Sequence, residues 1–220
     1  MNTVRRRLLL AAAGLFAAWA GVVTTPAQAA DAATTRIERY LAGSGALKAE
    51  FVQTQYSAAG REVRRASGIF YLRRPGRFRW EYLAPEQQLI VCDGRDIWMY
   101  ENDLQQVTIR SLAEATDATP AMILARSGGV GDVFTVTDAG THDGMEWFRL
   151  TPRAADPEFR GIELGFVEDD LRTMKFTDRL QQTTVIEFAA LDRRAKLADP
   201  LFRFTPPKGV DVVGRPSAGR

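Results

Sequence analysis

The chain contains few of the side chains on which hydrolases and metal sites depend. It has one cysteine, Cys92, and one histidine, His142, among 220 residues. No disulfide can form within it, so packing and strand pairing must stabilise the fold. His142 occurs in a Thr-His-Asp-Gly turn pattern, and no serine or cysteine lies in a nucleophile-elbow motif. We therefore expect no enzyme activity, no metal site and no cofactor, and we interpret Cys92 as a small buried apolar residue.

Long apolar runs are also absent, except near the start of the sequence. Residues 8–20 are apolar; they follow three arginines, Arg5 to Arg7, and precede the small-residue pattern Ala27-Gln28-Ala29. This order predicts a secretory signal peptide over residues 1–29, cleaved near Ala29, and a mature domain over residues 30–220. The run is shorter than the ~20 residues that a membrane span requires. An uncleaved anchor is the alternative, but we favour a soluble exported domain.

An excess of positive charge is lacking once the signal peptide is removed. The full chain has 29 basic and 27 acidic residues, but residues 1–29 hold three of the arginines and no acidic residue, which leaves 26 basic residues. A near-neutral exported domain gives no support to nucleic-acid binding. We therefore do not interpret the pattern Arg77-Phe78-Arg79-Trp80 as a surface for stacking nucleic-acid bases.

The dominant pattern in the mature domain is the two-residue alternation of half-buried strands. In the clearest case Phe78, Trp80 and Tyr82 alternate with charged side chains. Turns rich in Gly, Asp and Pro separate eleven predicted strands, at residues 47–51, 68–72, 77–82, 87–92, 96–100, 104–110, 133–138, 145–152, 161–167, 171–178 and 183–190. The expected fold is mainly β with short helices, as an antiparallel barrel or wrapped sheet.

Two short segments follow a helical pattern instead. Residues 34–41 place Ile37, Tyr40 and Leu41 at helical spacing, after threonines in the position of a cap. Residues 119–128 begin with Thr119 and Pro120 and end at a glycine, and their middle is apolar on every side. A helix this short must pack on the sheet. Two interpretations stay open: a plug in an ordinary core, or a movable lid over a cavity.

Arg74 lies where an apolar strand meets Pro75, just before the most amphipathic strand of the chain. If its side chain is enclosed, the guanidinium needs several hydrogen-bond acceptors, and carbonyl groups of a neighbouring short helix are suitable ones. A surface arginine at the end of a strand is the equally open alternative.

Four stretches carry a more specific signal when they are taken together. They are residues 68–80 (GIFYLRRPGRFRW), 90–100 (IVCDGRDIWMY), 119–125 (TPAMILA) and 202–210 (FRFTPPKGV). In this order they resemble the outer-membrane lipoprotein carrier protein (LolA) family. The resemblance implies an unclosed antiparallel β-barrel of about eleven strands covered by a helical lid, with an apolar interior that holds the acyl chains of a lipoprotein.

The resemblance also implies roles for particular residues. Arg74 matches the lid-contacting arginine of the family, and Phe78 matches the neighbouring aromatic residue of the cavity. With the apolar strand faces, this predicts a lipid cavity formed by Phe51, Phe70, Phe78, Trp80 and Ile90. The predicted lid consists of Pro120, Met122, Ile123, Leu124 and Ala125, with Arg74 as its latch. Ala121 departs from the family pattern, in which a bulkier apolar residue is expected.

The implied function is that of a monomeric periplasmic chaperone in outer-membrane biogenesis. It would take acylated lipoproteins from an inner-membrane lipoprotein-releasing ABC transporter and hand them to an outer-membrane lipoprotein acceptor. Within the same fold, a carrier of another lipid or a lipoprotein-sensing regulator is the alternative. An exported lipid hydrolase is a different class, which the missing nucleophile, base and metal ligands disfavour.

The cleavage pattern at Ala27 to Ala29 generates the first prediction. We expect the exported protein to begin at or next to Ala30, because signal peptidase cleaves after a small-x-small sequence. Intact-mass measurement on protein from the periplasm checks this. A mass that retains residues 1–29 would contradict both the signal peptide and the soluble exported domain.

Overall fold

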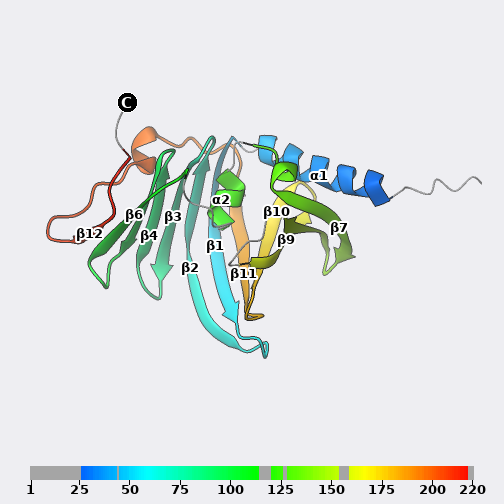
Figure 1. The fold of residues 1–220 in the computed structure, drawn as a ribbon, viewed down its shortest axis with the longest axis horizontal. Helices are drawn as coiled ribbons and strands as arrows, with labels where there is room; N and C mark the ends of the chain where they lie inside the picture. The colour runs from blue at the N-terminus through cyan, green and yellow to red at the C-terminus, as the bar shows by residue number, and fades with distance from the viewer. Residues whose placement is uncertain (1–25, 44, 114–119, 126–127, 154–158, 218–220) are drawn as a thin grey trace, which may run out of the picture.

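The computed structural model describes residues 26–43, 45–113, 120–125, 128–153 and 159–217. Most of these residues form one large sheet with two α-helices (Figure 1). In chain order the elements are α1 (Pro26–Gly43), β1 (Ala46–Tyr56), β2 (Glu62–Arg73), β3 (Arg77–Ala84), β4 (Gln88–Asp93), β5 (Asp96–Glu101), β6 (Gln106–Ser111), α2 (Pro120–Ala125), η1 (Val130–Asp132), β7 (Phe134–His142), β8 (Met145–Pro152), β9 (Phe159–Val167), β10 (Asp170–Asp178), β11 (Thr183–Asp192), η2 (Asp199–Phe202) and β12 (Asp211–Val213).

The sheet has the strand order β12-β6-β5-β4-β3-β2-β1-β11-β10-β9-β8-β7. Neighbouring strands are antiparallel except at one end, where β12 runs parallel to β6. In the described part of the chain the two end strands, β12 and β7, do not pair with each other. The unclosed antiparallel barrel expected from the sequence is therefore confirmed, and the eleven expected strands are present as β1 to β11. The three-residue β12 is an addition that the sequence pattern did not predict.

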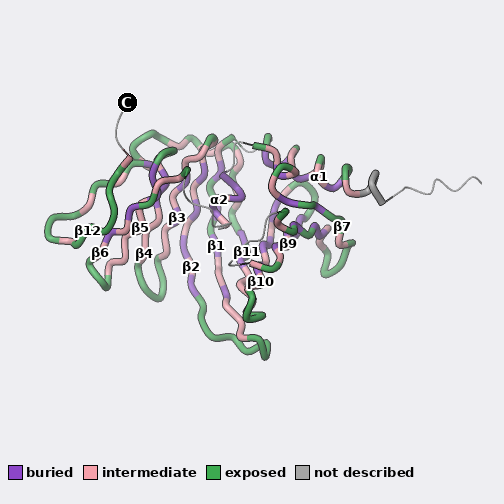
Figure 2. Tube along the Cα trace, viewed as in Figure 1, coloured by how far each residue is buried: buried purple, intermediate pink, exposed green. Residues whose placement is uncertain are grey.

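The two helices lie on the same side of the curved sheet, which we call the inner face (Figure 1). The main core forms there, where helix residues such as Ile37 and Leu124 pack with strand residues such as Phe70 and Leu164. Figure 2 shows that burial is concentrated beside the helices, whereas the far end of the β1–β2 hairpin is exposed. The inner face is thus the place where a cavity can form.

Helix α1 starts at Pro26, whereas the sequence pattern predicted a helix over residues 34–41. The expected N-terminal boundary is wrong. Thr34 lies inside the helix, where its hydroxyl donates a hydrogen bond to the Ala30 carbonyl at 2.9 Å instead of capping the first turn. Alanine has the highest helix propensity, and Ala30, Ala32 and Ala33 extend the helix towards its N-terminus.

Helix α1 covers the inner face near β7 to β10. The Tyr40 ring meets Phe166 of β9 edge-on at 5.1 Å between ring centroids. Arg36 lies over the same Phe166 ring at 5.1 Å and pairs with Asp169 at 3.3 Å. This half of the inner face is filled by the chain itself.

The segment after β11 crosses to the other side of the sheet, the outer face, behind β3 and β4. Phe202 of η2 is 1% exposed, and the Arg73 guanidinium lies over its ring at 4.9 Å. Arg73 also pairs with Asp199 at 2.5 Å, and this hydrogen-bonded pair lowers the pKa of the Asp199 carboxyl. Further along, Phe204 packs on Trp98 of β5 at 6.1 Å. The C-terminal segment therefore forms a second, smaller apolar cluster on the outer face.

No helix in the described residues is long and apolar enough to cross a membrane. The same residues contain no group of three or more histidine, cysteine, aspartate or glutamate side chains arranged to hold a metal ion.

The second apolar cluster generates a prediction about stability. Phe202→Ala removes a fully buried ring, and we expect the free energy of unfolding to fall by ~3–5 kcal/mol, the usual range for a buried Phe→Ala change. Urea denaturation followed by circular dichroism measures it. The matched control is Leu104→Ala, because Leu104 is 65% exposed. Similar small losses from both variants would show that the C-terminal segment contributes little to the fold.

Candidate functional site

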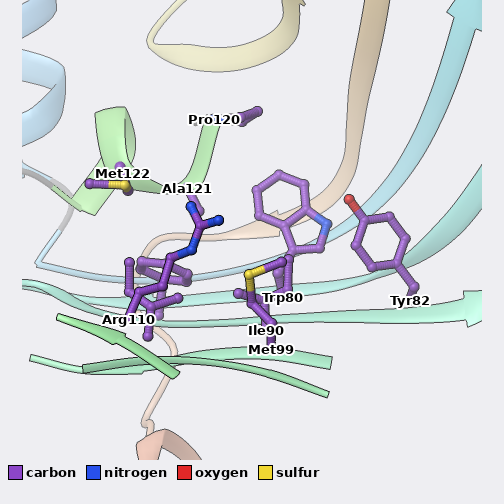
Figure 3. Close-up of a pocket in the computed structure, with 10 residues that line it drawn as sticks. Trp80, Tyr82, Ile90, Met99, Arg110, Pro120, Ala121 and Met122 are labelled. Carbon is purple, nitrogen blue, oxygen red and sulfur yellow. The ribbon is translucent and has the colours of Figure 1, made fainter. Parts of the chain in front are cut away.

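A cavity that is open to solvent on one side lies between α2 and strands β3 to β6, and its empty space, with the solvent at its mouth included, is about 610 Å³. Its walls are mostly apolar, and Figure 3 shows their side chains converging below the lid helix. The lining residues are Phe78, Trp80, Tyr82, Ile90, Ile97, Met99, Arg110, Pro120, Ala121 and Met122. A concave apolar surface with a few polar groups is the usual form of a site for a small, largely apolar ligand.

Strand register explains why these residues meet. Three rows of side chains cross β3 to β6 on the inner face, namely Phe78–Cys92–Ile97–Arg110, Trp80–Ile90–Met99–Thr108 and Tyr82–Gln88–Glu101–Gln106. Side chains two residues apart on a strand share a face, so the alternation in β3 places its three aromatic rings in three successive rows. The first two rows are apolar until they reach β6, where Thr108 and Arg110 stand. The apolar floor thus ends in a polar rim along β6 and along the third row.

The predicted cavity residues separate into two groups. Phe78, Trp80 and Ile90 line the cavity. Phe51 and Phe70 do not; they lie behind Trp80, with ring centroids 4.9 and 4.6 Å from it, and both are almost fully buried. These two rings support the cavity wall from the core side.

Sequence reasoning missed four lining residues: Tyr82, Ile97, Met99 and Arg110. Tyr82 continues the aromatic alternation of β3, and Met99 stands opposite Ile90 across β4 and β5. Both positions therefore follow once the strand pairing is known. No sequence pattern predicted Arg110 as a lining residue, because a charged side chain is not expected in the wall of an apolar cavity.

The lid helix α2 has two different faces. Pro120, Ala121 and Met122 line the cavity, whereas Ile123 and Leu124 are 2% and 1% exposed and belong to the main core. The helix is therefore packed on both sides, as its uniformly apolar sequence requires. The small Ala121 side chain leaves room in the cavity where a larger residue would fill it. The expected cap, Thr119, lies outside the described residues.

Two hydrogen bonds from the β2–β3 turn attach α2 to the sheet. The Arg74 guanidinium donates to the Leu124 carbonyl, and the Gly76 backbone N–H donates to the Ala125 carbonyl at 3.2 Å. Gly76 has φ +67°, a left-handed conformation that glycine adopts without strain. Burial lowers the pKa of the Arg74 guanidinium, although such a group stays charged in proteins. The turn thus satisfies two of the carbonyl groups at the C-terminal end of α2 that lack intrahelical partners.

Burial keeps two titratable groups near the cavity, the Cys92 thiol and the Tyr82 hydroxyl, in their neutral forms. Burial raises the pKa of the Cys92 thiol to about 11, so it is neither a nucleophile nor a metal ligand at neutral pH. Burial also raises the pKa of Tyr82 to about 12, and its hydroxyl donates to the Gln53 side-chain oxygen at 3.0 Å. His142 lies at the exposed end of β7, stacked on Trp147. The site is equipped to enclose an apolar ligand, and its groups suit binding better than acid–base chemistry.

A family model described as "Outer membrane lipoprotein carrier protein LolA" matches residues 42–205. The chain belongs to the LolA family. A protein of Dechloromonas aromatica (strain RCB) named outer-membrane lipoprotein carrier protein is 41% identical over 189 residues, covering 86% of this chain and 91% of that protein. One of the same name from Methylococcus capsulatus (strain ATCC 33009 / NCIMB 11132 / Bath) is 40% identical over 185 residues, covering 84% and 89%.

A solved structure extends the comparison to the fold. The crystal structure of an uncharacterized conserved protein from Thermus thermophilus superposes with a TM-score of 0.54 and covers 86% of this chain and all of that one, at 18% sequence identity. At this identity the likeness shows the shared fold alone. The LolA family assignment therefore rests on the sequence comparisons, and the open sheet agrees with it.

The attachment of α2 generates a prediction that can be measured at one amide. Arg74→Leu removes a charged donor, a contact worth about 1.5–3 kcal/mol, so the lid should open about 10- to 150-fold more often. The Gly76 amide, which is bonded to the Ala125 carbonyl, reports this opening by faster hydrogen exchange. The overall fold should stay intact, because the substitution removes the partly buried charge together with its contacts.

The matched control for this variant is Arg79→Leu. The Arg79 side chain is 19% exposed and pairs with Glu81, but it lies on the outer face of β3. Arg73 is unsuitable as a control, because it anchors the C-terminal segment through Asp199. Equal exchange of the Gly76 amide in both variants would show that Arg74 does not hold the lid.

Proposed function

We propose that the protein is a periplasmic carrier that encloses the acyl chains of lipoproteins and passes them to the outer membrane. The observation that carries the proposal is an apolar cavity in a member of the LolA family, covered by a short helix that is held to the sheet by two hydrogen bonds. Cys92 and His142 lack the environment of catalytic groups, which supports a binding role without chemistry.

The physical need for such a carrier is large. A triacylated lipoprotein exposes ~45 methylene-type carbons, and at ~0.8 kcal/mol each the cost of leaving them in water is tens of kcal/mol. Free diffusion of the lipoprotein through an aqueous compartment is therefore excluded. A protein that covers the chains removes this cost and lets the cargo cross.

The cavity volume indicates that the lid has to move during loading. A methylene group takes about the ~30 Å³ of one water molecule, so a sixteen-carbon chain needs ~480 Å³ and three chains need ~1,400 Å³. The empty space of about 610 Å³ at the cavity includes solvent at its mouth, and even so it is well below the volume of three chains. Displacing α2, with Ile123 and Leu124 leaving the core, is the simplest way to gain the remaining space. We infer that the structure represents the closed form.

The same lid supports release. In the closed form α2 occupies apolar surface that the cargo would otherwise cover, so lid and lipid compete for it. Cargo stays bound only if the free energy that it gains by binding in the cavity is larger than the free energy that the protein gains by closing the lid. Binding that is weakened in this way allows transfer to an acceptor with higher affinity. Arg74 would act here as the latch that favours closure.

The remaining parts of the proposal concern compartment and partners. We propose that residues 1–29 are removed during export and that residues 30–220 act as one monomeric domain. An inner-membrane lipoprotein-releasing ABC transporter would load it, and an outer-membrane lipoprotein acceptor would unload it. The outer-membrane acceptor accords with the name outer-membrane lipoprotein carrier protein, which the relatives bear.

A carrier of another lipid is the second candidate. The observation that favours it is the mostly apolar lining of the cavity, which suits the acyl chain of any lipid, whether or not a protein is attached to it. Mass spectrometry of lipids that co-purify from the periplasm separates the two candidates, because lipoproteins and free lipids differ in mass and in protein content.

The proposed function predicts the effect of a charge inside the cavity. Purified protein should hold a triacylated lipoprotein in solution as a complex, measured by ultracentrifugation after detergent removal. Ile90→Glu should reduce the soluble lipoprotein at least about tenfold, because an unpaired carboxylate is costly to bury beside acyl chains.

The control places the same charge one residue away. Leu89→Glu lies on the opposite face of β4, since neighbouring strand residues point to opposite faces, and it should leave the soluble fraction unchanged. Circular dichroism verifies that both variants are folded. A wild-type protein that keeps no lipoprotein in solution, or two variants that keep equal amounts, would contradict the carrier function.

A further inference from the structure

The indole nitrogen of Trp80 is a buried hydrogen-bond donor without a partner among the described residues. Trp80 is 3% exposed, and no acceptor in that part of the chain reaches its Nε1. The other two described tryptophans are satisfied: Trp98 Nε1 donates to Asp93 Oδ2 at 3.2 Å, and Trp147 Nε1 donates to the His142 carbonyl at 3.1 Å. Of these three, only Trp80 lines the cavity.

An unpaired buried N–H destabilises the protein, because the group loses its water without gaining an acceptor. Packing alone does not explain why the group is there. Phe51 and Phe70 contact the Trp80 ring through their own rings, and a phenyl group at position 80 would preserve aromatic contacts of this kind. A buried donor on a residue that lines a ligand cavity is instead suited to an acceptor on the ligand.

The surroundings of Trp80 restrict what that acceptor can be. Figure 3 shows the indole nitrogen on the side of the ring that faces Tyr82. The atom is covered in this closed form, so an acceptor on a ligand reaches it when the lid is displaced. The Tyr82 hydroxyl already donates to Gln53. Beside Trp80 across the strands stand Ile90 and Met99, which offer no acceptor of comparable strength. The apolar row of Trp80 therefore fits an acceptor attached to hydrocarbon, and a neutral acceptor matches the neutral indole N–H. A charged group would instead be drawn to Arg110, which lines the cavity in the neighbouring row.

We propose that Trp80 Nε1–H donates a hydrogen bond to the ester carbonyl oxygen of an acyl chain bound in the cavity. The inference rests on the proposed function, because it names the chemical group by which that site recognises its cargo. Hydrocarbon alone lacks an acceptor, and an ether oxygen accepts more weakly than a carbonyl. Trp80 is thus a specificity-determining residue that selects O-acyl glyceryl esters and fixes how far the chain enters.

Ester-linked and ether-linked lipids of equal chain length test this directly, because the carbonyl is their principal difference. The probes are synthetic S-diacylglyceryl-cysteine lipopeptides and phosphatidylglycerols, each in both forms, since either lipid class is a source of the ester. Binding is measured by displacement of an apolar fluorescent probe from the cavity. The wild-type protein should bind the ester form about five- to tenfold more tightly, and Trp80→Phe should bind both forms equally.

The matched control is Trp98→Phe. Trp98 stands on the outer face of β5 and donates to Asp93, so this variant should keep the full ester preference. A second measurement uses the wild-type protein, so it does not depend on whether Trp80→Phe folds. In an NMR spectrum of ¹⁵N-labelled indole groups, the resonance of the Trp80 N–H proton should move downfield when the ester form binds and much less when the ether form binds.

The outcomes are distinct. Ester preference in the lipopeptides, in the phosphatidylglycerols or in both supports the inference, and the class that binds identifies the source of the ester. Equal binding of ester and ether forms by the wild-type protein overturns it and leaves the carrier function intact. A preference that persists in Trp80→Phe, or an unmoved Trp80 resonance, also overturns it. Failure of every lipid to bind refutes the proposed function itself.

Discussion

The inner face of one open sheet must be covered to exclude water, and in this chain two helices cover only part of it. α1 fills the half formed by β7 to β10, where Tyr40 and Arg36 contact Phe166. The six residues of α2 reach the middle of the sheet and stop there. The apolar rows of β3 to β6 are left with too little protein above them, and the cavity is the result. The position of the site is thus a consequence of incomplete coverage.

A wall that lacks full packing on one side needs support from the other. The C-terminal segment supplies it behind the cavity strands, where Phe202 is buried and Phe204 packs on Trp98. Arg73 connects this segment to β2 through Asp199, while Arg74, the next residue, reaches α2 on the inner side. Two consecutive arginines therefore attach opposite layers to the same strand end. In the proposed loading step, cargo would replace α2 on the inner face while the outer cluster keeps the strands in register.

Sequence patterns predicted the parts of this architecture that depend on local alternation. The eleven main strands follow from period-two runs and turn residues, because half-buried strands impose that pattern. The start of α1 and the strand β12 did not follow, since the first depends on alanine propensity and the second on docking of a distant segment against β6. For the site, single-strand reasoning grouped Phe51 with the cavity and omitted Met99. Only the pairing of β3, β4 and β5 shows which residues lie side by side.

The length of α2 has a consequence for the energetics of transport. A helix of six residues does not persist in water away from a packing surface, so displacement from the sheet also unwinds it. Under the proposed lid movement, each cycle of loading and release would then contain a small folding reaction of the lid. Burial of apolar surface carries a large heat-capacity change and weakens on cooling. The equilibrium between empty and loaded carrier would therefore depend on temperature through the lid as well as through the lipid. A carrier from a cold environment would need a lid of different composition to keep the same equilibrium.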